Sequence, residues 1–245
     1  YGQKKAMRLV WSDEFNYTGL PDKNKWNYDT IGNTYGWGND ESQWYTYVNS
    51  NNAFVQNGIL TISSLLQDYM GKKYTSARLT TKNKGDWKYG RIEVRAKLPK
   101  GRGTWPAIWM FPTHSKYGDW PKSGEIDIME QVGSDPDTIL STSHTEFYNH
   151  QINTQKGAKY YLPTSFTSFH VYSLEWNKNE WKTYVDNSLC FTFKNEKIGS
   201  GAWPYDQPFH LILNLAIGGG LGGQKGIDDK LFPHKFQIDY VRVYQ

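Results

Sequence analysis

Hydrophobic and polar residues alternate along much of this chain, with the period of two that is typical of β-strands. The clearest runs are ILTISSLL (59–66), GRIEVRAKL (90–98), GEIDIM (124–129), HVYSLEW (170–176), WKTYVD (181–186), LCFTF (189–193), HLILNLAI (210–217) and QIDYVRVY (237–244). Helical periodicity is nearly absent, and loops rich in Gly, such as 98–103 and 218–223, separate the runs. The pattern predicts short β-strands joined by turns.

The spacing of the strands predicts an all-β sandwich of two antiparallel sheets. Residues 169–193 are expected to form a three-stranded meander, because turn sequences divide them. Residues 9–15 and 236–244 also have strand patterns, and we expect these two segments to pair. The sequence contains neither repeats nor linkers, so we predict one domain over residues 1–245.

Aromatic residues make up 16% of the chain, including 11 Trp and 18 Tyr. Aromatic side chains pack well on pleated sheets, so one interpretation is an aromatic core. A second interpretation is a solvated cleft in which sugar rings lie against aromatic faces. Composition leaves both open.

Charge, hydropathy and cysteine content argue against a nucleic-acid partner, a membrane span and a catalytic thiol. The net charge of +4 comes largely from lysines dispersed along the chain, which argues against nucleic acid as a partner. No apolar run approaches the length of a membrane span. The single cysteine, Cys190, lies in the alternating run SLCFTF, which predicts a buried core thiol and not a catalytic one.

Three carboxylates stand close together in SGEIDIMEQVG, residues 123–133. Glu125 and Asp127 are in phase with strand alternation, whereas Glu130 is one residue out of step. A β-bulge at Met129 or its neighbour would return Glu130 to the face of the other two acids. We therefore predict a bulged strand with all three acids on one face and the isoleucines in the core.

Paired carboxyl groups on one face are typical of glycosidases. A retaining enzyme needs them about 5–5.5 Å apart and an inverting enzyme about 6.5–9.5 Å apart, so sequence spacing alone leaves the stereochemistry open. An ionised Asp127 between the glutamates would orient Glu125. Its charge would also keep Glu130 protonated.

The acid strand and several other motifs resemble family 16 of the glycoside hydrolases. The motifs are GEIDIMEQVG (124–133) with its extra Met, GTWPAIWMFP (103–112), WSDEF (11–15), GNDESQWYT (38–46) and IDYVRVYQ (238–245). The form with the extra Met is typical of laminarinases, and the lichenases of the family lack that residue. The resemblance implies a β-jelly-roll sandwich with an open substrate cleft on the concave face.

The same resemblance implies the reaction, which is endo-hydrolysis of β-1,3-glucan with retention of configuration. Glu125 would be the nucleophile, Asp127 its assisting acid and Glu130 the general acid/base. No cofactor would be needed for catalysis.

Six further residues are candidates for contacts with the glucan. Trp105 and Trp109 share a strand face, and the resemblance makes them the floor of the subsites that hold the non-reducing side of the substrate; ordinary core tryptophans are the alternative. By resemblance, the other candidates are Trp120, His144, Asn39 and Arg78.

The resemblance also implies a structural Ca²⁺ on the convex face. Its ligands would be backbone carbonyls at Glu14 and Gly58 and the side chain of Asp239. The protein is expected to act as a secreted or cell-surface monomer.

Other functions stay open at this stage. The alternatives are a non-catalytic β-glucan-binding protein, a hydrolase of mixed-linkage β-glucan, a hydrolase of agar or carrageenan galactans, and a transglycosylase. The acid trio argues against a pure binding protein. The glycine-rich segment 216–226 is expected to be a mobile loop over the cleft.

Overall fold

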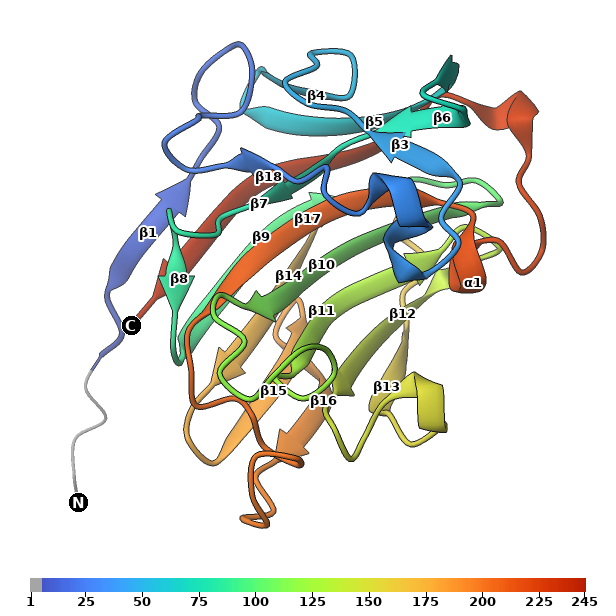
Figure 1. Ribbon diagram of the computed structural model, residues 1–245. Coiled ribbons are helices and arrows are strands. Elements are labelled where there is room, and N and C mark those ends of the chain that lie inside the picture. Colours follow the sequence, from blue (N-terminus) through green and yellow to red (C-terminus); the bar gives the residue numbers. More distant parts are fainter. Residues whose placement is uncertain (1–5) are drawn as a thin grey trace.

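Two β-sheets packed face to face form the molecule (Figure 1). The computed structural model describes residues 6–245. Over these residues the larger sheet has ten strands. They are β1 (Leu9–Asp13), β3 (Gln43–Tyr45), β4 (Ala53–Gln56), β5 (Ile59–Tyr69), β6 (Lys72–Ser76), β9 (Gly90–Lys97), β14 (His170–Trp176), β15 (Glu180–Val185), β16 (Ser188–Lys194) and β18 (His234–Tyr244).

The smaller sheet has eight strands within the same described range. They are β2 (Asn27–Tyr28), β7 (Arg78–Thr80), β8 (Asp86–Trp87), β10 (Thr104–Pro112), β11 (Glu125–Val132), β12 (Asp135–His144), β13 (Lys156–Tyr161) and β17 (Phe209–Ile217). Short helical turns connect some of the strands: η1 (Asn33–Gly38), η2 (His150–Ile152), α1 (Gly219–Gly222) and η3 (Asp229–Leu231).

The predicted architecture is confirmed, with one local difference. The meander is β14–β15–β16, and the strands near the two ends, β1 and β18, pair as expected. The strand pairs are antiparallel apart from β3 and β6, which run parallel. This pair departs from the antiparallel pattern because β3 follows the η1 segment and joins the edge of the larger sheet rather than a hairpin neighbour.

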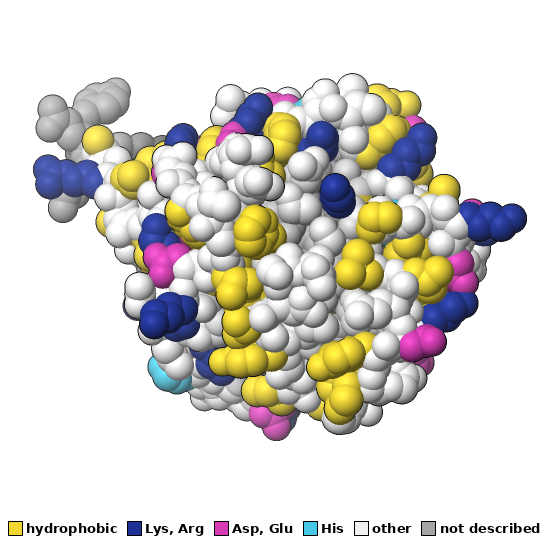
Figure 2. Space-filling model, turned by 90° about the horizontal axis from the view of Figure 1, so that it is seen from above, with side chains coloured by type: hydrophobic (Ala, Val, Ile, Leu, Met, Phe, Trp, Pro, Cys, Tyr) yellow, Lys and Arg dark blue, Asp and Glu magenta, His cyan; other side chains and the backbone are white. Residues whose placement is uncertain are grey.

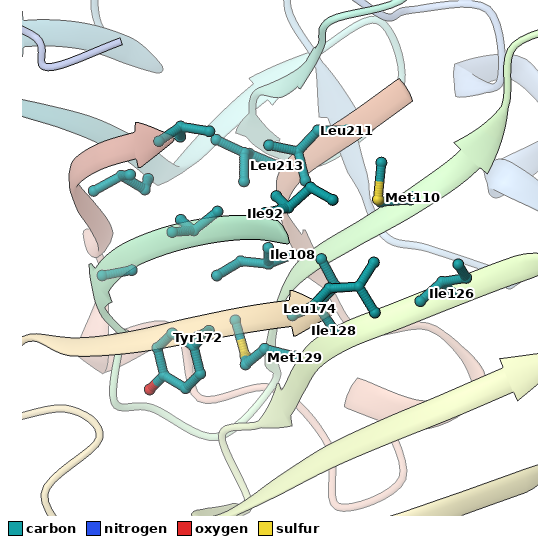
Figure 3. Packing of buried hydrophobic residues seen from close by; sticks show 14 of the residues in the cluster. Ile92, Ile108, Met110, Ile126, Ile128, Met129, Tyr172, Leu174, Leu211 and Leu213 are labelled. Carbon is teal, nitrogen blue, oxygen red and sulfur yellow. The ribbon is translucent and has the colours of Figure 1, made fainter. Parts of the chain in front are cut away.

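Aliphatic and aromatic side chains fill the space between the sheets (Figure 3). Every residue of β17 is buried, because this strand lies in the middle of the smaller sheet. Ile108 and Met110 of β10 meet Ile92 of β9 and Leu174 of β14 in this core. Each fully buried aliphatic side chain contributes about 1.5–3 kcal/mol relative to exposure, so the core holds the two sheets in fixed register.

The predicted bulge in β11 is present. Between Asp127 and Glu130, β11 advances three residues while β12 advances two, from Thr142 to Leu140. The register against β10 shifts at the same place. As a result, Ile128 and Met129 are consecutive residues that are both buried in the core, and Glu130 returns to the outer face.

Cys190 is less buried than the sequence predicts. It is partly exposed and packs against the margin of the core, because β16 is the edge strand of the larger sheet. Burial still raises the pKa of this thiol to about 11, so the thiolate is disfavoured at neutral pH.

Surface properties agree with a dispersed charge. On the face seen in Figure 2, Lys and Arg side chains stand apart from one another among polar and hydrophobic groups. Within residues 6–245, no helix has the length and apolar character needed to span a membrane.

Candidate active site

The outer face of the smaller sheet gathers the three acids beside two tryptophans. Glu125, Asp127 and Glu130 extend from β11 on the side opposite the buried Ile126. On the neighbouring strand β10, Trp109 is paired with Asp127 and is partly exposed on the same face. Trp105 is also partly exposed there, so neither tryptophan is a core residue.

Each glutamate accepts a hydrogen bond from an indole N–H. Trp120 donates to Oε2 of Glu125 at 2.7 Å, and Trp105 donates to Oε1 of Glu130 at 2.9 Å. Such a bond fixes the carboxyl group and favours its ionised form. In each glutamate one oxygen is therefore held by indole, and the second oxygen is the one available for chemistry.

Burial favours the neutral form of Asp127, whereas the sequence predicts an ionised one. Asp127 is only 2% exposed, and this burial raises its pKa well above the usual range for Asp. The charges of Glu125 and Glu130 and a hydrogen bond with Glu125 raise it further. The charge that raises the pKa of Glu130 is that of Glu125, and the protonated form of Asp127 is the one that would donate a hydrogen bond to Glu125.

Glu130 has the titration behaviour expected of a general acid. Burial and the charge of Glu125 raise its pKa to about 7, against the opposing effect of the Trp105 hydrogen bond. Because a pKa near the working pH allows both donation and removal of a proton, Glu130 can act as acid and as base.

His144 lies at the end of β12, opposite Glu125. Its Nε2 is 3.5 Å from Oδ2 of Asp127, and burial lowers the pKa of the ring, which keeps it neutral. One ligand atom each of Glu125, Asp127 and His144 lie within 4.8 Å of one another, a grouping compact enough to hold a metal ion. His150 of η2 packs against this group, with its ring 5.0 Å from that of Trp120 and 5.2 Å from that of His144.

Tyr205 supports the acid strand from the core side. Its buried hydroxyl donates to the backbone carbonyl of Glu125 at 2.9 Å and lies 2.6 Å from Oγ of Ser143. Burial raises the pKa of Tyr205 far above the ordinary value, so it remains a neutral donor. The backbone at the first acid is thus fixed by a side chain from outside both sheets.

Arg78 of β7 lies between the rings of Trp37 and Trp109 on the same sheet face. Its guanidinium carbon lies 4.2 Å from the centre of the Trp37 ring and 4.8 Å from that of Trp109, and its Nε donates to Asp29 at 3.1 Å. The indole N–H of Trp109 donates to Asn214 at 2.7 Å. Arg78 is therefore packed between two aromatic rings, where planar guanidinium is well suited.

Asn39 lies next to the glycine-rich segment that follows β17. The backbone N–H of Gly220 donates to the Asn39 carbonyl at 2.8 Å, and Gly218 is bonded in the same way to Gly103. A Cβ on Gly219 would lie 2.9 Å from the Asn39 carbonyl and 3.2 Å from the ring of Trp105, and its φ of +74° also favours glycine. Residues 219–222 of the segment form α1, and the backbone hydrogen bonds of Gly218 and Gly220 attach it beside Trp105. The mobility of this segment over the cleft stays a prediction.

The three calcium candidates lie along one edge of β18. Asp13, next to Glu14, pairs with Val241, while Leu60, two residues after Gly58, pairs with Ile238. A register shift between β18 and β9 at Ile238–Tyr240 places Asp239 in a bulge, outside the core. The carboxylate of Asp239 pairs with Arg95, and Glu14 pairs with Arg242 at 2.8 Å.

Several residues of this site carry no signal that the sequence analysis used. Trp37, His150, Asn214 and Tyr205 are far from the acid motif in sequence. Trp37 contacts Arg78, and Asn214 accepts the hydrogen bond of Trp109, only after η1 and β17 have folded next to β7 and β10. The motif GNDESQWYT does hold a usable signal, because Glu41, Gln43 and Tyr45 alternate and all three are buried.

Comparison with known proteins gives concordant matches over nearly the whole chain. The sequence model of glycosyl hydrolases family 16 matches residues 40–242. A beta-glucanase from Rhodothermus marinus is 52% identical over 244 residues, which covers 97% of this chain and 85% of that protein.

Solved structures agree with the sequence matches. The laminarinase from Rhodothermus marinus superposes with a TM-score of 0.95 at 51% identity and covers 98% of both chains. A variant of SCLam, a non-specific endo-β-1,3(4)-glucanase, superposes with a TM-score of 0.93 at 48% identity over 98% of this chain and 95% of the other. That variant was co-crystallised with 1,3-β-D-cellotriosyl-glucose and presents 1,3-β-D-cellobiosyl-glucose at its active site.

Proposed function

Because this chain belongs to family 16 of the glycosyl hydrolases, we propose that it cleaves β-1,3-glucan internally, with net retention of the anomeric configuration. The observation that carries the proposal is the pair of glutamates on one face of β11, each held by an indole N–H, with the buried Asp127 between them. A double displacement requires two such carboxyl groups, one as nucleophile and one as general acid/base.

In the first step, Glu125 attacks the anomeric carbon through the oxygen that Trp120 does not hold. The glycosidic C–O bond breaks as Glu130 donates its proton to the leaving oxygen. A glycosyl ester on Glu125 results. The proton of Asp127 hydrogen-bonds to Glu125 and stabilises the charge that this residue carries before attack and after release.

In the second step, Glu130 acts as a base. It removes a proton from water while the water oxygen attacks the anomeric carbon and the ester bond to Glu125 breaks. Both residues return to their starting protonation states. Since the glycosyl ester leaves Glu125 uncharged, the pKa of Glu130 falls in the intermediate, which makes it a better base at the moment it is needed.

The aromatic side chains of β10 supply the substrate surface. Trp105 and Trp109 would stack on sugar rings, with Asn39 and Arg78 supplying polar contacts farther from the cleavage point. A glucan with mixed 1,3 and 1,4 linkages is a second candidate substrate, favoured by the similarity to a non-specific endo-β-1,3(4)-glucanase.

Proton NMR of fresh laminarin digestion tests the proposal. New reducing ends should appear first as the β-anomer and then relax to the equilibrium mixture, because retention produces the configuration of the bond that was cut. Barley β-glucan, agarose and carrageenan are digested in parallel to define the substrate class.

Early α-anomer would contradict the retaining mechanism. Absence of new reducing ends from laminarin and barley glucan, with retained binding, would indicate a glucan-binding protein. Cleavage of agarose or carrageenan alone would indicate a galactan hydrolase.

We also propose a structural Ca²⁺ at the edge of β18. Carbonyl oxygens at Glu14 and Gly58 and the carboxylate of Asp239 come from three segments that adjoin this strand, and oxygen donors suit calcium. Arg95 donates to Oδ2 of Asp239, so Oδ1 of Asp239 is the oxygen that would bind Ca²⁺ together with the two carbonyls. The ion would tie β1 and the β4–β5 turn to β18.

Chelation should therefore lower thermal stability. Removal of Ca²⁺ with EGTA is expected to lower the Tm by several degrees, because the loss of a ligand that binds only the native state removes its binding free energy. The Asp239→Asn variant should show a smaller shift between calcium and chelator. Equal melting temperatures of the wild type in calcium and in chelator would contradict this proposal.

We further propose that the protein acts as a monomer outside the cell, where polymeric glucan is found. A stable dimer in analytical ultracentrifugation, or retention of the protein in the cytoplasm on cell fractionation, would contradict these two statements.

A further inference from the structure

Glu41 is a buried acid that the reaction does not use. It is 4% exposed and lies just before β3, at the isolated β-bridge with Gly218. Buried carboxylates are unfavourable unless hydrogen bonds compensate for lost hydration, so the partners of Glu41 indicate its purpose.

Three side chains donate to this carboxylate. Oε1 accepts from Nδ2 of Asn39 at 3.2 Å, while Oε2 accepts from Nε2 of Gln43 at 2.7 Å and from the hydroxyl of Tyr45 at 3.3 Å. Gln43 in turn accepts from the backbone N–H of Ile217 at 2.7 Å. The carboxylate thus joins the η1 end to β3 and to the end of β17.

The hydrogen bonds continue from Tyr45 to the floor of the cleft. Nδ2 of Asn214 donates to the Tyr45 hydroxyl at 3.1 Å, and the indole N–H of Trp109 donates to Oδ1 of Asn214 at 2.7 Å. All the donors point toward Glu41. Since a carboxylate has no proton to give, this direction cannot be reversed while Glu41 is ionised.

We propose that Glu41 is a positioning residue that fixes Asn39 and Trp109 together, through two branches of one hydrogen-bond network. The inference rests on the proposed function, because these two residues are the sugar contacts assigned to the non-reducing side of the substrate. On the first branch, the Glu41 carboxylate accepts from Nδ2 of Asn39. The Asn39 amide is therefore held with its nitrogen toward Glu41 and its oxygen directed away from Glu41. On the second branch, the fixed indole N–H leaves Trp109 to meet sugar with its ring and not its nitrogen.

The variant Glu41→Gln tests this role with nearly unchanged shape. Its amide cannot accept from all three donors, and its own N–H groups would face donors, so Asn39 and Tyr45 must reorient. We expect KM for laminarin to rise about 10- to 100-fold, because two sugar contacts are misplaced and a hydrogen bond at each contributes up to about tenfold. A change in kcat below about fivefold is expected, because the network touches binding residues and not the acids.

Two further variants separate positioning from simple destabilisation. Tyr45→Phe breaks only the Trp109 branch and should raise KM about 3- to 10-fold, the effect of one hydrogen bond. In an Asn39→Ala background, Glu41→Gln should raise KM less than it does in the wild type, because one of its two routes is already lost. Glu93→Gln is the matched control, a partly buried glutamate of β9 that pairs with Arg91 in the other sheet, and its KM should not change.

Binding of laminaritetraose, measured by calorimetry, and the Tm of each variant complete the test. An unchanged KM in both Glu41→Gln and Tyr45→Phe would overturn the proposal, as would full additivity with Asn39→Ala. Failure of the wild type itself to bind or cleave laminarin would instead overturn the proposed function. If Glu41→Gln does not fold, Tyr45→Phe and its KM decide the matter.

Discussion

The Glu125→Gln variant is expected to lose activity on laminarin by at least about 10⁴-fold in kcat, the scale seen when a nucleophile is removed. The amide cannot form the glycosyl ester, so the first step has no attacking group. Its oxygen can still accept the hydrogen bond that Trp120 gives to Glu125, and the strand is held by Tyr205 at the backbone. Laminarin oligosaccharides should therefore bind with affinity within a few-fold of the wild type.

Initial rates of reducing-end release and calorimetric binding measure the two halves of this prediction. Glu180→Gln is a suitable control, since Glu180 lies on β15 of the other sheet and pairs there with Lys182. Activity within tenfold of the wild type would show that another residue attacks. Loss of binding together with activity would place Glu125 in substrate affinity and not in chemistry.

The Glu130→Gln variant should lose about 10²- to 10⁴-fold in kcat on laminarin, the usual contribution of a general acid/base. The loss should be much smaller for the first step of an aryl β-glucoside whose leaving group needs no proton. In the second step, water lacks its base, so the glycosyl ester should accumulate. Azide, which needs no base, should release it as the β-glycosyl azide.

The pH dependence of the wild type identifies the same residue. Glu130 must be protonated in the free enzyme, and burial with the charge of Glu125 raises its pKa to about 7. Hence kcat/KM should be maintained below this pH and fall as pH rises through it. The alkaline fall should vanish in Glu130→Gln. A variant that keeps the same fall, or an azide effect equal to that in the wild type, would contradict the assignment.

The sequence predicted the elements in which the polarity of each side chain indicates whether it is buried or exposed. Long alternating runs became strands β5, β9, β14 and β18, because apolar residues on alternate positions have only one way to be buried together. The displaced Glu130 predicted the bulge for the same reason, since a regular strand would have placed its carboxylate in the core. These features depend on local chemistry and are therefore present in the sequence.

Other features depend on what the fold brings near. Asp127 looked like an ionised acid because the sequence does not show that it would be 2% exposed between two glutamates. Cys190 looked buried because alternation does not show which strand lies at a sheet edge. The Glu41 network joins positions from 39 to 217, so no local pattern could indicate that Trp109 belongs to it.

The bulge in β11 has a consequence for how this strand can change in length. Successive residues of a strand point alternately to the cleft and to the core. The deletion of one residue next to Ile126 would therefore turn every later side chain of the strand to the opposite face, with acids in the core and isoleucines over the cleft. The loss of Ile128 or Met129 is different. It would leave the acids at strictly alternate positions of an unbulged strand, each on the face it occupies now, with Glu130 about 3.3 Å nearer along the chain. The strand can therefore keep its three acids on the cleft face at two lengths. The two lengths differ by one of the two buried residues, Ile128 or Met129, that lie between Asp127 and Glu130.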